Sequence, residues 1–348
     1  MNGLQRDAAA ATAAPLVRVS DLRMYFPGPR AGFWPWQGWL TVKAVDGVSF
    51  AIAPGETLGL VGESGCGKST IARSVLQLYR PTAGEVFFEG RDLCRLSAAE
   101  LRPMRQRAQI IFQDPYASLD PRRTIGYTVA EPLLLAGLTD AGRRRERVQQ
   151  LLRLVGLDPS YENRYPHEFS GGQRQRVGIA RALATEPSFI VADEPISALD
   201  VSIQAQVINL LVDLRNRLNL TLLFISHDLR VVRFISHQIA VMYLGRVVET
   251  APAEDLFRSP GHPYTLALLS AVPRARWEDT GTQPIKLEGE VPSPINPPPG
   301  CAFAPRCPLA TEICRTVTPT LSPLASRHDV ACHHTAQVQS LRGADAGC

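Results

Sequence analysis

A glycine-rich segment in the first quarter of the chain has the spacing needed to bind a phosphate chain. Residues 62–70 read Gly-Glu-Ser-Gly-Cys-Gly-Lys-Ser-Thr and fit the pattern G-x-x-x-x-G-K-S/T. Glycines let backbone N–H groups turn towards the phosphates, and the N-terminus of a following helix adds favourable partial charge. The candidate nucleotide ligands are Gly62, Glu63, Ser64, Gly65, Cys66, Gly67, Lys68, Ser69 and Thr70.

Within this loop, two side chains have distinct expected roles. Lys68 would place a positive charge on the β and γ phosphates, and Ser69 would offer a hydroxyl to Mg²⁺. We interpret Cys66 as a small loop residue and not as a nucleophile.

Two carboxylates end an apolar run at residues 189–192. Asp193 can hold Mg²⁺ through water, and Glu194 can polarise an attacking water molecule. An apolar run that ends in Asp-Glu is weak evidence alone, but it gains weight beside a phosphate-binding loop. Together they predict the Mg²⁺-dependent hydrolysis of a nucleoside triphosphate.

A second anion-binding surface is predicted at Ser170-Gly171-Gly172-Gln173, which precedes an Arg- and Gln-rich helix. It would present free N–H groups and a hydroxyl at a helix N-terminus. One chain seldom needs two such surfaces for one triphosphate. We therefore expect a head-to-tail dimer, in which each chain gives the loop to one nucleotide and this motif to the other.

The elements that must position these residues alternate between strands and helices. Strands are predicted at 16–19, 48–52, 57–61, 109–112, 189–192, 221–225 and 239–243, and helices at 69–78, 141–155 and 173–184. This alternation predicts an α/β fold with a largely parallel sheet and a ligand at the carboxyl ends of its strands. Residues 28–39, rich in glycine, proline and tryptophan, read as a surface hairpin.

Composition excludes several classes of protein. Charged residues make up 20% of the 348 residues and hydrophobic residues 45%, so a sizeable core is expected. The net charge of +4 does not indicate a dedicated nucleic-acid binder. No run approaches the ~20 apolar residues of a membrane-spanning helix, and no secretory signal is evident. A soluble, cytoplasmic chain is expected, and any membrane role would be peripheral.

With these motifs, the sequence resembles the ATP-binding-cassette ATPases over nearly the whole body of the chain. Ser170–Gln173 matches the family signature. Gln113 matches the glutamine loop that senses Mg²⁺ and the transmembrane partner, and Ser197–Asp200 matches the loop that crosses the dimer interface. His227 matches the switch histidine at the γ-phosphate. The resemblance implies that ATP is the nucleotide and that Lys68, Gln113, Glu194 and His227 carry the catalysis, with Ser69, Gln113 and Asp193 around Mg²⁺.

An aromatic residue that stacks on adenine is also implied by the resemblance. Phe26 stands in its place, with Tyr25 as the alternative. Core packing is the other interpretation of Phe26.

The expected fold is a phosphate-loop ATPase core with a mainly parallel sheet, a helical subdomain, an antiparallel β edge and a loop-rich, cysteine-containing C-terminal appendage. We expect a disordered tail at 1–14 and the ATP-binding cassette at 15–260, with its helical signature subdomain at about 114–184. The C-terminal region would then span 261–348. One set of motifs predicts one nucleotide-binding unit.

The C-terminal part is similar to that of the ATPases of oligopeptide and dipeptide importers. The similarity lies at His262-Pro263-Tyr264, 266–272, 292–297 and the cysteines that follow, while 113–119 and the insert at 28–39 resemble the second, F-like subunit. This implies a peripheral motor on the cytoplasmic face of the bacterial inner membrane. Its partners would be a related ATPase subunit as a heterodimer, two transmembrane permease subunits and an extracytoplasmic solute-binding protein, with no nucleic acid.

Other functions stay open at this point. The wider family also imports nickel, glutathione or other small solutes. A soluble cassette ATPase of DNA repair or translation is a further alternative, although no heptad run or paired cassette supports it. A small-molecule kinase would leave Ser170–Gln173 and His227 unexplained.

Cysteines crowd the last 48 residues, and in a reducing cytoplasm such clustering suggests a metal. Cys301, Cys307, Cys314 and Cys332 could hold an iron–sulfur cluster, and some resembled importer ATPases carry a [4Fe–4S] cluster in this region. Zinc is the alternative, with His333 or His334 able to replace a thiolate. Free cysteines are the third interpretation, and Cys348 is expected to be a free terminal thiol.

Overall fold

The computed structural model describes residues 14–30, 38–272, 285 and 287–338. The predicted tail at 1–14, except Ala14, the centre of the insert at 28–39, and Cys348 lie outside these ranges. The chain forms two compact units. Among the described residues, unit 1 comprises 14–17, 51–57 and 87–226, and unit 2 comprises 18–30, 38–50, 58–86, 227–272, 285 and 287–338.

Unit 1 contains three parallel strands in the order β8 (Thr221–Ile225), β7 (Phe189–Asp193) and β6 (Ala108–Ile111). Every residue of β7 and β8 is buried. A strand that is buried on both faces reads as a continuous apolar run, which is why these two strands are visible in the sequence. The predicted parallel arrangement is confirmed here.

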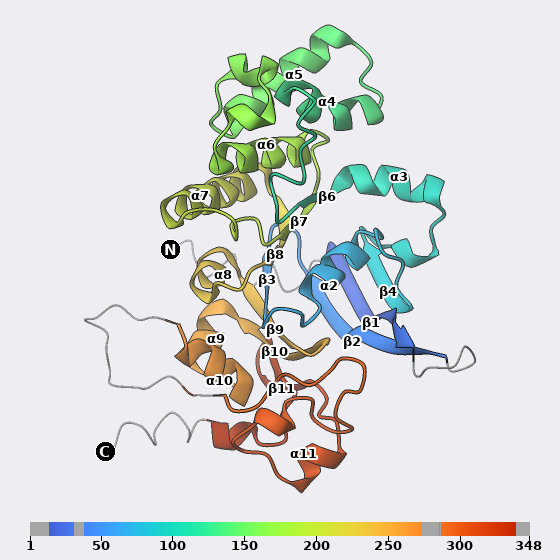
Figure 1. Cartoon of the computed structure of the whole chain (residues 1–348), viewed down its shortest axis with the longest axis vertical. Coiled ribbons are helices and arrows are strands. Elements are labelled where there is room, and N and C mark those ends of the chain that lie inside the picture. Colours follow the sequence, from blue (N-terminus) through green and yellow to red (C-terminus); the bar gives the residue numbers. More distant parts are fainter. Residues whose placement is uncertain (1–13, 31–37, 273–284, 286, 339–348) are drawn as a thin grey trace. The chain divides into compact units, whose positions relative to one another are not determined.

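Helices make up most of the rest of unit 1: α3 (Ala98–Arg107), α4 (Ile125–Leu135), α5 (Ala141–Leu154), α6 (Gly171–Leu183) and α7 (Val201–Leu218). Figure 1 shows α4, α5 and α6 grouped together in green, as expected for a helical subdomain. Short 3₁₀ turns at Leu93–Arg95, Pro159–Asn163 and Pro166–Glu168 join the elements. Two arginines of α5 form ion pairs, Arg145 with Glu162 and Arg147 with Glu186.

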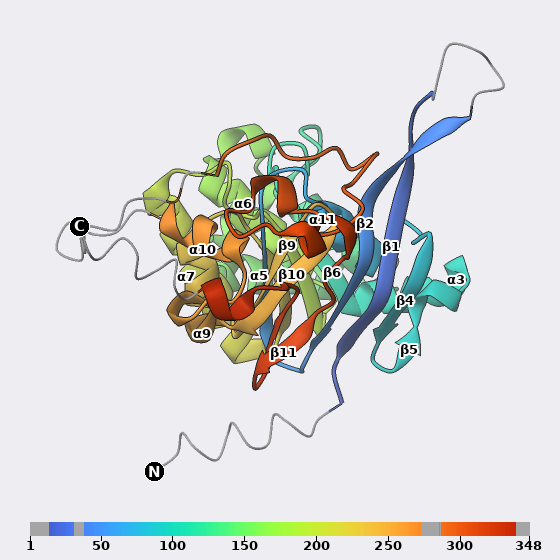
Figure 2. The ribbon, with the colours of Figure 1, turned by 90° about the horizontal axis from the view of Figure 1, so that it is seen from below.

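Unit 2 contains a strand series in the order β11 (Ser322–Ala325), β12 (His328–Val330), β10 (Arg246–Pro252), β9 (Gln238–Tyr243) and β3 (Thr57–Val61). β3 and β9 are parallel, whereas β10 pairs antiparallel with β9 and with β12. The predicted antiparallel edge is therefore present. The C-terminal segment, red in Figure 2, supplies its two outer strands.

A second sheet places β1 (Val17–Arg30) between β2 (Trp39–Ile52) and β4 (Ala83–Phe88), with β5 (Arg91–Asp92) paired to the end of β4. β1 and β2 run side by side in Figure 2. Both are longer than the strands predicted from their apolar runs, because each has one exposed face and extends into polar residues.

The helices of unit 2 are short: α2 (Lys68–Val75), α8 (Leu229–Ile235), α9 (Ala253–Arg258), α10 (Pro263–Ser270) and α11 (Glu312–Thr316), with a 3₁₀ turn at Ala304–Arg306. No helix in the described residues is long and apolar enough to cross a membrane.

Candidate functional site

The glycine-rich loop joins β3 to α2, the strand–loop–helix context that a phosphate site needs. Gly62, Gly65 and Gly67 have φ values of 151°, 81° and 106°. The last two lie in the left-handed region that glycine adopts without strain. Gly67 caps α2 in this conformation, so the loop turns sharply into the helix.

Close approach of the backbone makes two of these glycines irreplaceable. A Cβ on Gly62 would lie 2.3 Å from the carbonyl oxygen of Met242, and one on Gly67 would lie 2.2 Å from that of Ala44. Around Gly65 nothing lies within 4 Å of an added Cβ, so its constraint is conformational alone. The backbones of β2 and β9 thus leave no room for a side chain at these two positions of the loop.

Lys68 is 5% exposed, and its ammonium group donates to the carbonyl oxygens of Gly62 and Glu63 at 2.8 and 3.0 Å. The lysine is therefore already held at the loop that would receive the phosphates. Burial raises the pKa of the Cys66 thiol, which keeps it protonated and supports its interpretation as an inert loop residue.

The two predicted carboxylates lie at the carboxyl end of β7. Asp193 is 2% exposed, and Glu194 follows it with a left-handed φ of 46°. The Glu194 N–H donates to the carbonyl of Ile225 at the end of β8, which fixes the turn. The side-chain amide of Gln113 donates to the Glu194 carboxylate at 3.1 Å. The structure thus brings two predicted catalytic residues together.

Ser170 caps α6 as predicted from the Ser-Gly-Gly-Gln motif. Its hydroxyl accepts from the Gln173 N–H, and the Gln173 side chain accepts from the Ser170 N–H, which makes a capping box. The cap orients the N-terminus of a thirteen-residue helix, whose dipole favours an anion at that end.

The signature glycines pack against the loop around Asp200. A Cβ on Gly172 would lie 2.4 Å from the Ile203 side chain, and one on Gly171 would lie 3.3 Å from that of Leu199. The main-chain carbonyl of Asp200, at the N-terminus of α7, accepts from the Ile203 N–H. The signature and this loop therefore form one packed surface of unit 1.

Two arginines of α6 tie the signature helix to the segment after Gln113, and neither is predicted from the sequence motifs. The Arg174 guanidinium lies 3.8 Å from the centre of the Tyr116 ring, and Arg181 donates to the carbonyl of Ser118 at 2.6 Å. Burial lowers the pKa of Arg181. The only sequence signal for these contacts was the richness of the helix in arginine and glutamine. A buried arginine needs polar or aromatic partners, so contacts of this kind could have been expected.

Three predicted residues, His227, Phe26 and Tyr25, lie in unit 2. His227 is exposed just before Asp228, which caps α8. Phe26 packs edge-on against Tyr79 at 5.6 Å, and the Tyr25 hydroxyl donates to Asp46 at 2.5 Å. Phe26 stays the predicted adenine contact, with Tyr25 and core packing as its alternatives.

Two groups of predicted residues are thus assembled separately. Unit 1 brings together Gln113, Glu194 and the signature surface, and unit 2 holds Lys68 within the glycine loop. Their union in one catalytic site, with His227, stays a prediction. Hydroxyl, amide and carboxylate oxygens, from Ser69, Gln113 and Asp193, are the hard donors that Mg²⁺ prefers, so the donor chemistry fits this ion.

The predicted iron–sulfur centre is wrong. Within residues 14–30, 38–272, 285 and 287–338, no group of three or more His, Cys, Asp or Glu side chains is arranged to hold a metal ion. Cys301, Cys307, Cys314 and Cys332 are free thiols. Burial raises the pKa of Cys307 and of Cys332 to about 11, and it also raises that of Cys301. Burial therefore favours the protonated form of these thiols.

The zinc alternative has no better support in the described ranges. The ring Nε2 of His333 lies 3.0 Å from the carbonyl oxygen of Val317, and that of His334 lies 2.7 Å from the Thr311 hydroxyl. Each of these ring nitrogens thus has a hydrogen-bond partner, and neither histidine belongs to a group of side chains arranged to hold a metal ion in the described residues. The interpretation as free cysteines remains.

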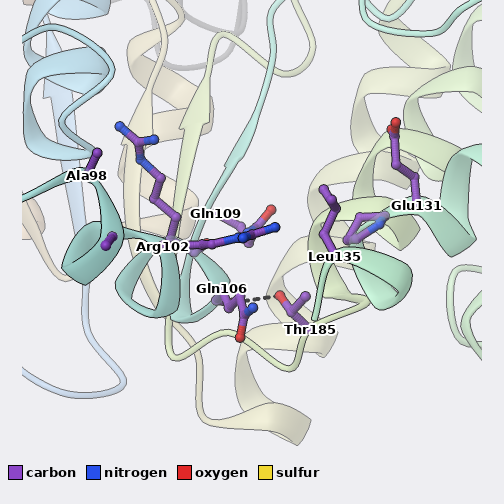
Figure 3. A pocket seen from close by; sticks show the side chains of 10 residues that line it. Ala98, Arg102, Gln106, Gln109, Glu131, Leu135 and Thr185 are labelled. Atoms are coloured by element: carbon purple, nitrogen blue, oxygen red, sulfur yellow. Dashed lines mark hydrogen bonds between the residues drawn. The ribbon is translucent and has the colours of Figure 1, made fainter. Parts of the chain in front are cut away.

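A largely apolar cavity of about 590 Å³ lies in unit 1 between α3, α4 and the start of β6. Figure 3 shows Arg102 and Gln109 on one side and Glu131 and Leu135 on the other. Leu135 is 62% exposed, which is unusual for a large apolar side chain. Thr185 donates to the carbonyl of Gln106 at its floor.

Comparison with known families gives two matches along the chain. The family described as "ABC transporter" matches residues 45–197, and the one described as "Oligopeptide/dipeptide transporter, C-terminal region" matches residues 248–314. Both predicted resemblances, to the cassette ATPases and to the importer C-terminal region, are confirmed.

Known proteins resemble the chain over almost its full length. It is 52% identical to the oligopeptide transport ATP-binding protein AppF of Bacillus subtilis, with 93% of this chain and 98% of that protein covered. It is 54% identical to a putative peptide import ATP-binding protein of Brucella ovis, with 92% and 98% covered. These names describe ATP-binding proteins and mention no iron–sulfur cluster.

Solved structures agree with the fold. The dimeric cassette MJ0796 bound to ADP and Pi is 30% identical, with a TM-score of 0.60 over 68% of this chain and 98% of that chain. The cassette cbiO1 of Clostridium perfringens, part of the transporter complex cbiONQ, is 25% identical, with a TM-score of 0.61 over 71% and 92%. The predicted fold class is confirmed.

Proposed function

Because the chain belongs to the family of ATP-binding-cassette transporter ATPases, we propose that it is the ATP-hydrolysing motor subunit of a bacterial di- and oligopeptide importer. The observation that supports the motor role most strongly is the hydrogen bond from Gln113 to Glu194. It joins the loop expected to sense the membrane partner to the carboxylate expected to activate water. Similarity to AppF over 93% of the chain, including the C-terminal region, supports the peptide cargo.

In the proposed reaction, the glycine loop binds the phosphates through its backbone N–H groups, and Lys68 neutralises charge on the β and γ phosphates. Glu194 accepts a hydrogen bond from the attacking water and polarises it. His227 contacts the γ-phosphate. Mg²⁺, held from Ser69, Gln113 and Asp193, would supply charge neutralisation on the phosphate oxygens.

The signature surface is proposed to complete the ATP site of a second subunit. Ser170 and the N–H groups at the start of α6 offer hydrogen bonds that the chain's own glycine loop does not need. Closure of two chains around two ATP molecules would bury this surface. The F-like resemblance favours a related ATPase chain as the partner. The solved MJ0796 cassette is itself described as dimeric.

Two transmembrane permease subunits are the proposed membrane partners, which would place the chain peripherally on the cytoplasmic face of the membrane. The cavity between α3 and α4 supports one contact site. Its apolar lining and exposed Leu135 suit a protein segment, and Gln109 of β6 lies only four residues before Gln113. An extracytoplasmic solute-binding protein would deliver the cargo in the complete system.

The proposal is tested by reconstitution in liposomes. The chain would be combined with a partner ATPase, permease subunits and a binding protein from the same organism, and with labelled peptides of about two to eight residues. We expect peptide uptake that requires ATP and stops when Glu194 is replaced by Gln. Uptake of nickel or glutathione without peptide uptake would show that the cargo is not a peptide. Full ATPase activity with no association with any membrane protein would instead favour a soluble cassette ATPase.

A further inference from the structure

The glycine loop receives two contacts from the C-terminal region, and both converge on Glu63. The two terminal nitrogens of Arg306 donate to the two carboxylate oxygens of Glu63, at 2.8 and 3.1 Å. The Glu63 backbone N–H donates to the hydroxyl of Tyr264 at 2.9 Å. Side chain and main chain of one loop residue are therefore both held by residues about 200 or more positions away in sequence.

Arg306 depends on this pairing because it is buried. Its side chain is 8% exposed, and its guanidinium lies 5.9 Å from the centre of the Tyr243 ring. Its Nε atom has no hydrogen-bond partner among the described residues. A buried charge of this kind is stable only when it is paired, and the Glu63 carboxylate raises the pKa of Arg306.

Tyr264 is equally fixed. Its ring is fully buried and packs edge-on against Tyr243 at 4.8 Å, with Phe303 at 5.4 Å. Phe303 and Arg306 belong to the same short turn, since the Arg306 N–H donates to the Phe303 carbonyl. Tyr264 and Arg306, which both bind Glu63, thus belong to one aromatic cluster, so a movement of one is expected to move the other.

A second network anchors this cluster to the sheet. The buried carboxylate of Glu249, on β10, accepts from the N–H groups of Gly261 and His262 at 2.6 and 3.0 Å. It also lies 2.8 Å from Nε2 of His328 on β12. Residue 262 caps α10, which carries Tyr264. The residues that contact Glu63 are therefore anchored to the sheet through Glu249.

The position of Glu63 matters to the loop because its carbonyl oxygen, with that of Gly62, receives the Lys68 ammonium. We propose that Arg306 and Tyr264 are positioning residues of the nucleotide site, through which the C-terminal region sets the conformation of the glycine loop and hence its affinity for ATP. The proposal rests on the proposed role of this loop in binding nucleotide. It gives the C-terminal region a part in ATP binding.

The test is the dissociation constant of ATP with Mg²⁺, measured by calorimetric titration of the full chain. Arg306→Gln removes the charge, and Tyr264→Phe removes only the hydroxyl that accepts from the Glu63 N–H. We expect each to weaken ATP binding by about 5-fold to 100-fold, the range typical of coupling between linked sites. In the assembled ATPase, KM should rise while kcat changes little, because neither substitution removes a group that is proposed to act in hydrolysis. Arg306→Lys should restore part of the affinity.

A matched control separates positioning from general stability. Arg145→Gln also removes one partner of an ion pair whose carboxylate is buried, since Glu162 is 8% exposed, but it lies in α5. It should lower the unfolding temperature and leave ATP affinity unchanged. Lys68→Ala is the second control. If it too leaves affinity unchanged, the proposed nucleotide site itself fails, and not the positioning role.

A double-mutant cycle tests the route through Glu63. If Arg306 acts through this carboxylate, Arg306→Gln and Glu63→Gln together should weaken ATP binding no more than the stronger single variant. Additive losses would show that Arg306 acts by another route. Folded Arg306→Gln and Tyr264→Phe proteins with ATP affinity within twofold of the native value, beside a weakened Lys68→Ala, would overturn the proposal.

Discussion

The side-chain amide of Gln113 lies 3.1 Å from the carboxylate of Glu194, and it donates a hydrogen bond to it. The two residues stand at the ends of adjacent parallel strands, β6 and β7. Any movement of the segment after β6 therefore changes the surroundings of the carboxylate. In the proposed mechanism, this link would couple a partner that contacts this segment to the activation of water.

Replacing Glu194 by Gln should nearly abolish hydrolysis, because it removes the water-polarising carboxylate but keeps the glycine loop. We expect turnover to fall by at least about 10²-fold, with ATP affinity kept. Glu186→Gln, an exposed acid of the same unit paired with Arg147, is the control and should keep its activity. Near-normal phosphate release from the Glu194 variant would exclude this residue as the base.

An alanine at Gly67 should destroy the phosphate site. Its Cβ would overlap the Ala44 carbonyl at 2.2 Å, and its φ of 106° is unfavourable for alanine. We expect ATP affinity to fall at least about tenfold, or about 1.4 kcal/mol. Gly65→Ala carries the conformational strain without the overlap and should lose less. Equal losses for the two variants would show that strain alone is responsible.

At the signature, Gly172→Ala should force the Ile203 side chain away from its present position, because the added Cβ would lie 2.4 Å from it. Overpacking of this kind costs about 1–3 kcal/mol, which thermal unfolding would detect. Hydrolysis by the assembled ATPase should fall while the isolated chain still binds ATP. The matched control on the same helix is Gly178→Ala, which meets nothing within 4 Å. A Gly172 variant that loses ATP binding as a monomer would contradict the shared-site arrangement.

Acid should weaken the anchoring of α10. Burial lowers the pKa of His262 from 6.5 to about 4, against a smaller opposing effect of Glu249. Its Nδ1 accepts from the Tyr264 N–H, which only the unprotonated nitrogen can do. The neutral ring therefore stabilises the fold above pH 6.5, and this contribution is lost as the pH falls towards 4. The loss reaches about 3 kcal/mol.

The comparison for this prediction is His262→Asn, which keeps a capping acceptor but does not titrate in this range. The difference in unfolding free energy between the native chain and this variant should shrink from pH 7 to pH 4. A constant difference would mean that His262 does not carry the pH dependence.

Local pattern explains which parts of this molecule could be predicted. The glycine loop, β7, β8 and the cap at Ser170 follow from short runs of sequence, and the structure has them where they were expected. The eighteen-residue helix α7 was also within reach, because Val207, Ile208, Leu211 and Leu214 are buried at helical spacing.

Long-range pairing lies beyond such patterns. Arg306 and Glu63 are separated by 243 positions, and the residues around each of them give no sign that the two form a pair. The prediction of a metal centre from the cysteine cluster failed because it, too, depended on how distant residues come together. The spacing of the cysteines allowed a metal, but spacing does not reveal where the side chains lie, and the described residues hold no group of three or more metal-binding side chains. The joint action of His227, Lys68 and Glu194 stays a prediction.

The buried carboxylate of Glu249 also bears on how this protein can be shortened. A chain that stops near residue 260 would lose Gly261, His262 and His328, and so every described partner of that charge. It would also uncover the edge of β10, where β12 now pairs. An open strand edge beside an unpaired buried charge invites pairing with other chains. Deletion of the C-terminal region should therefore yield insoluble protein, and a soluble shortened cassette would first need Glu249 replaced by an uncharged residue.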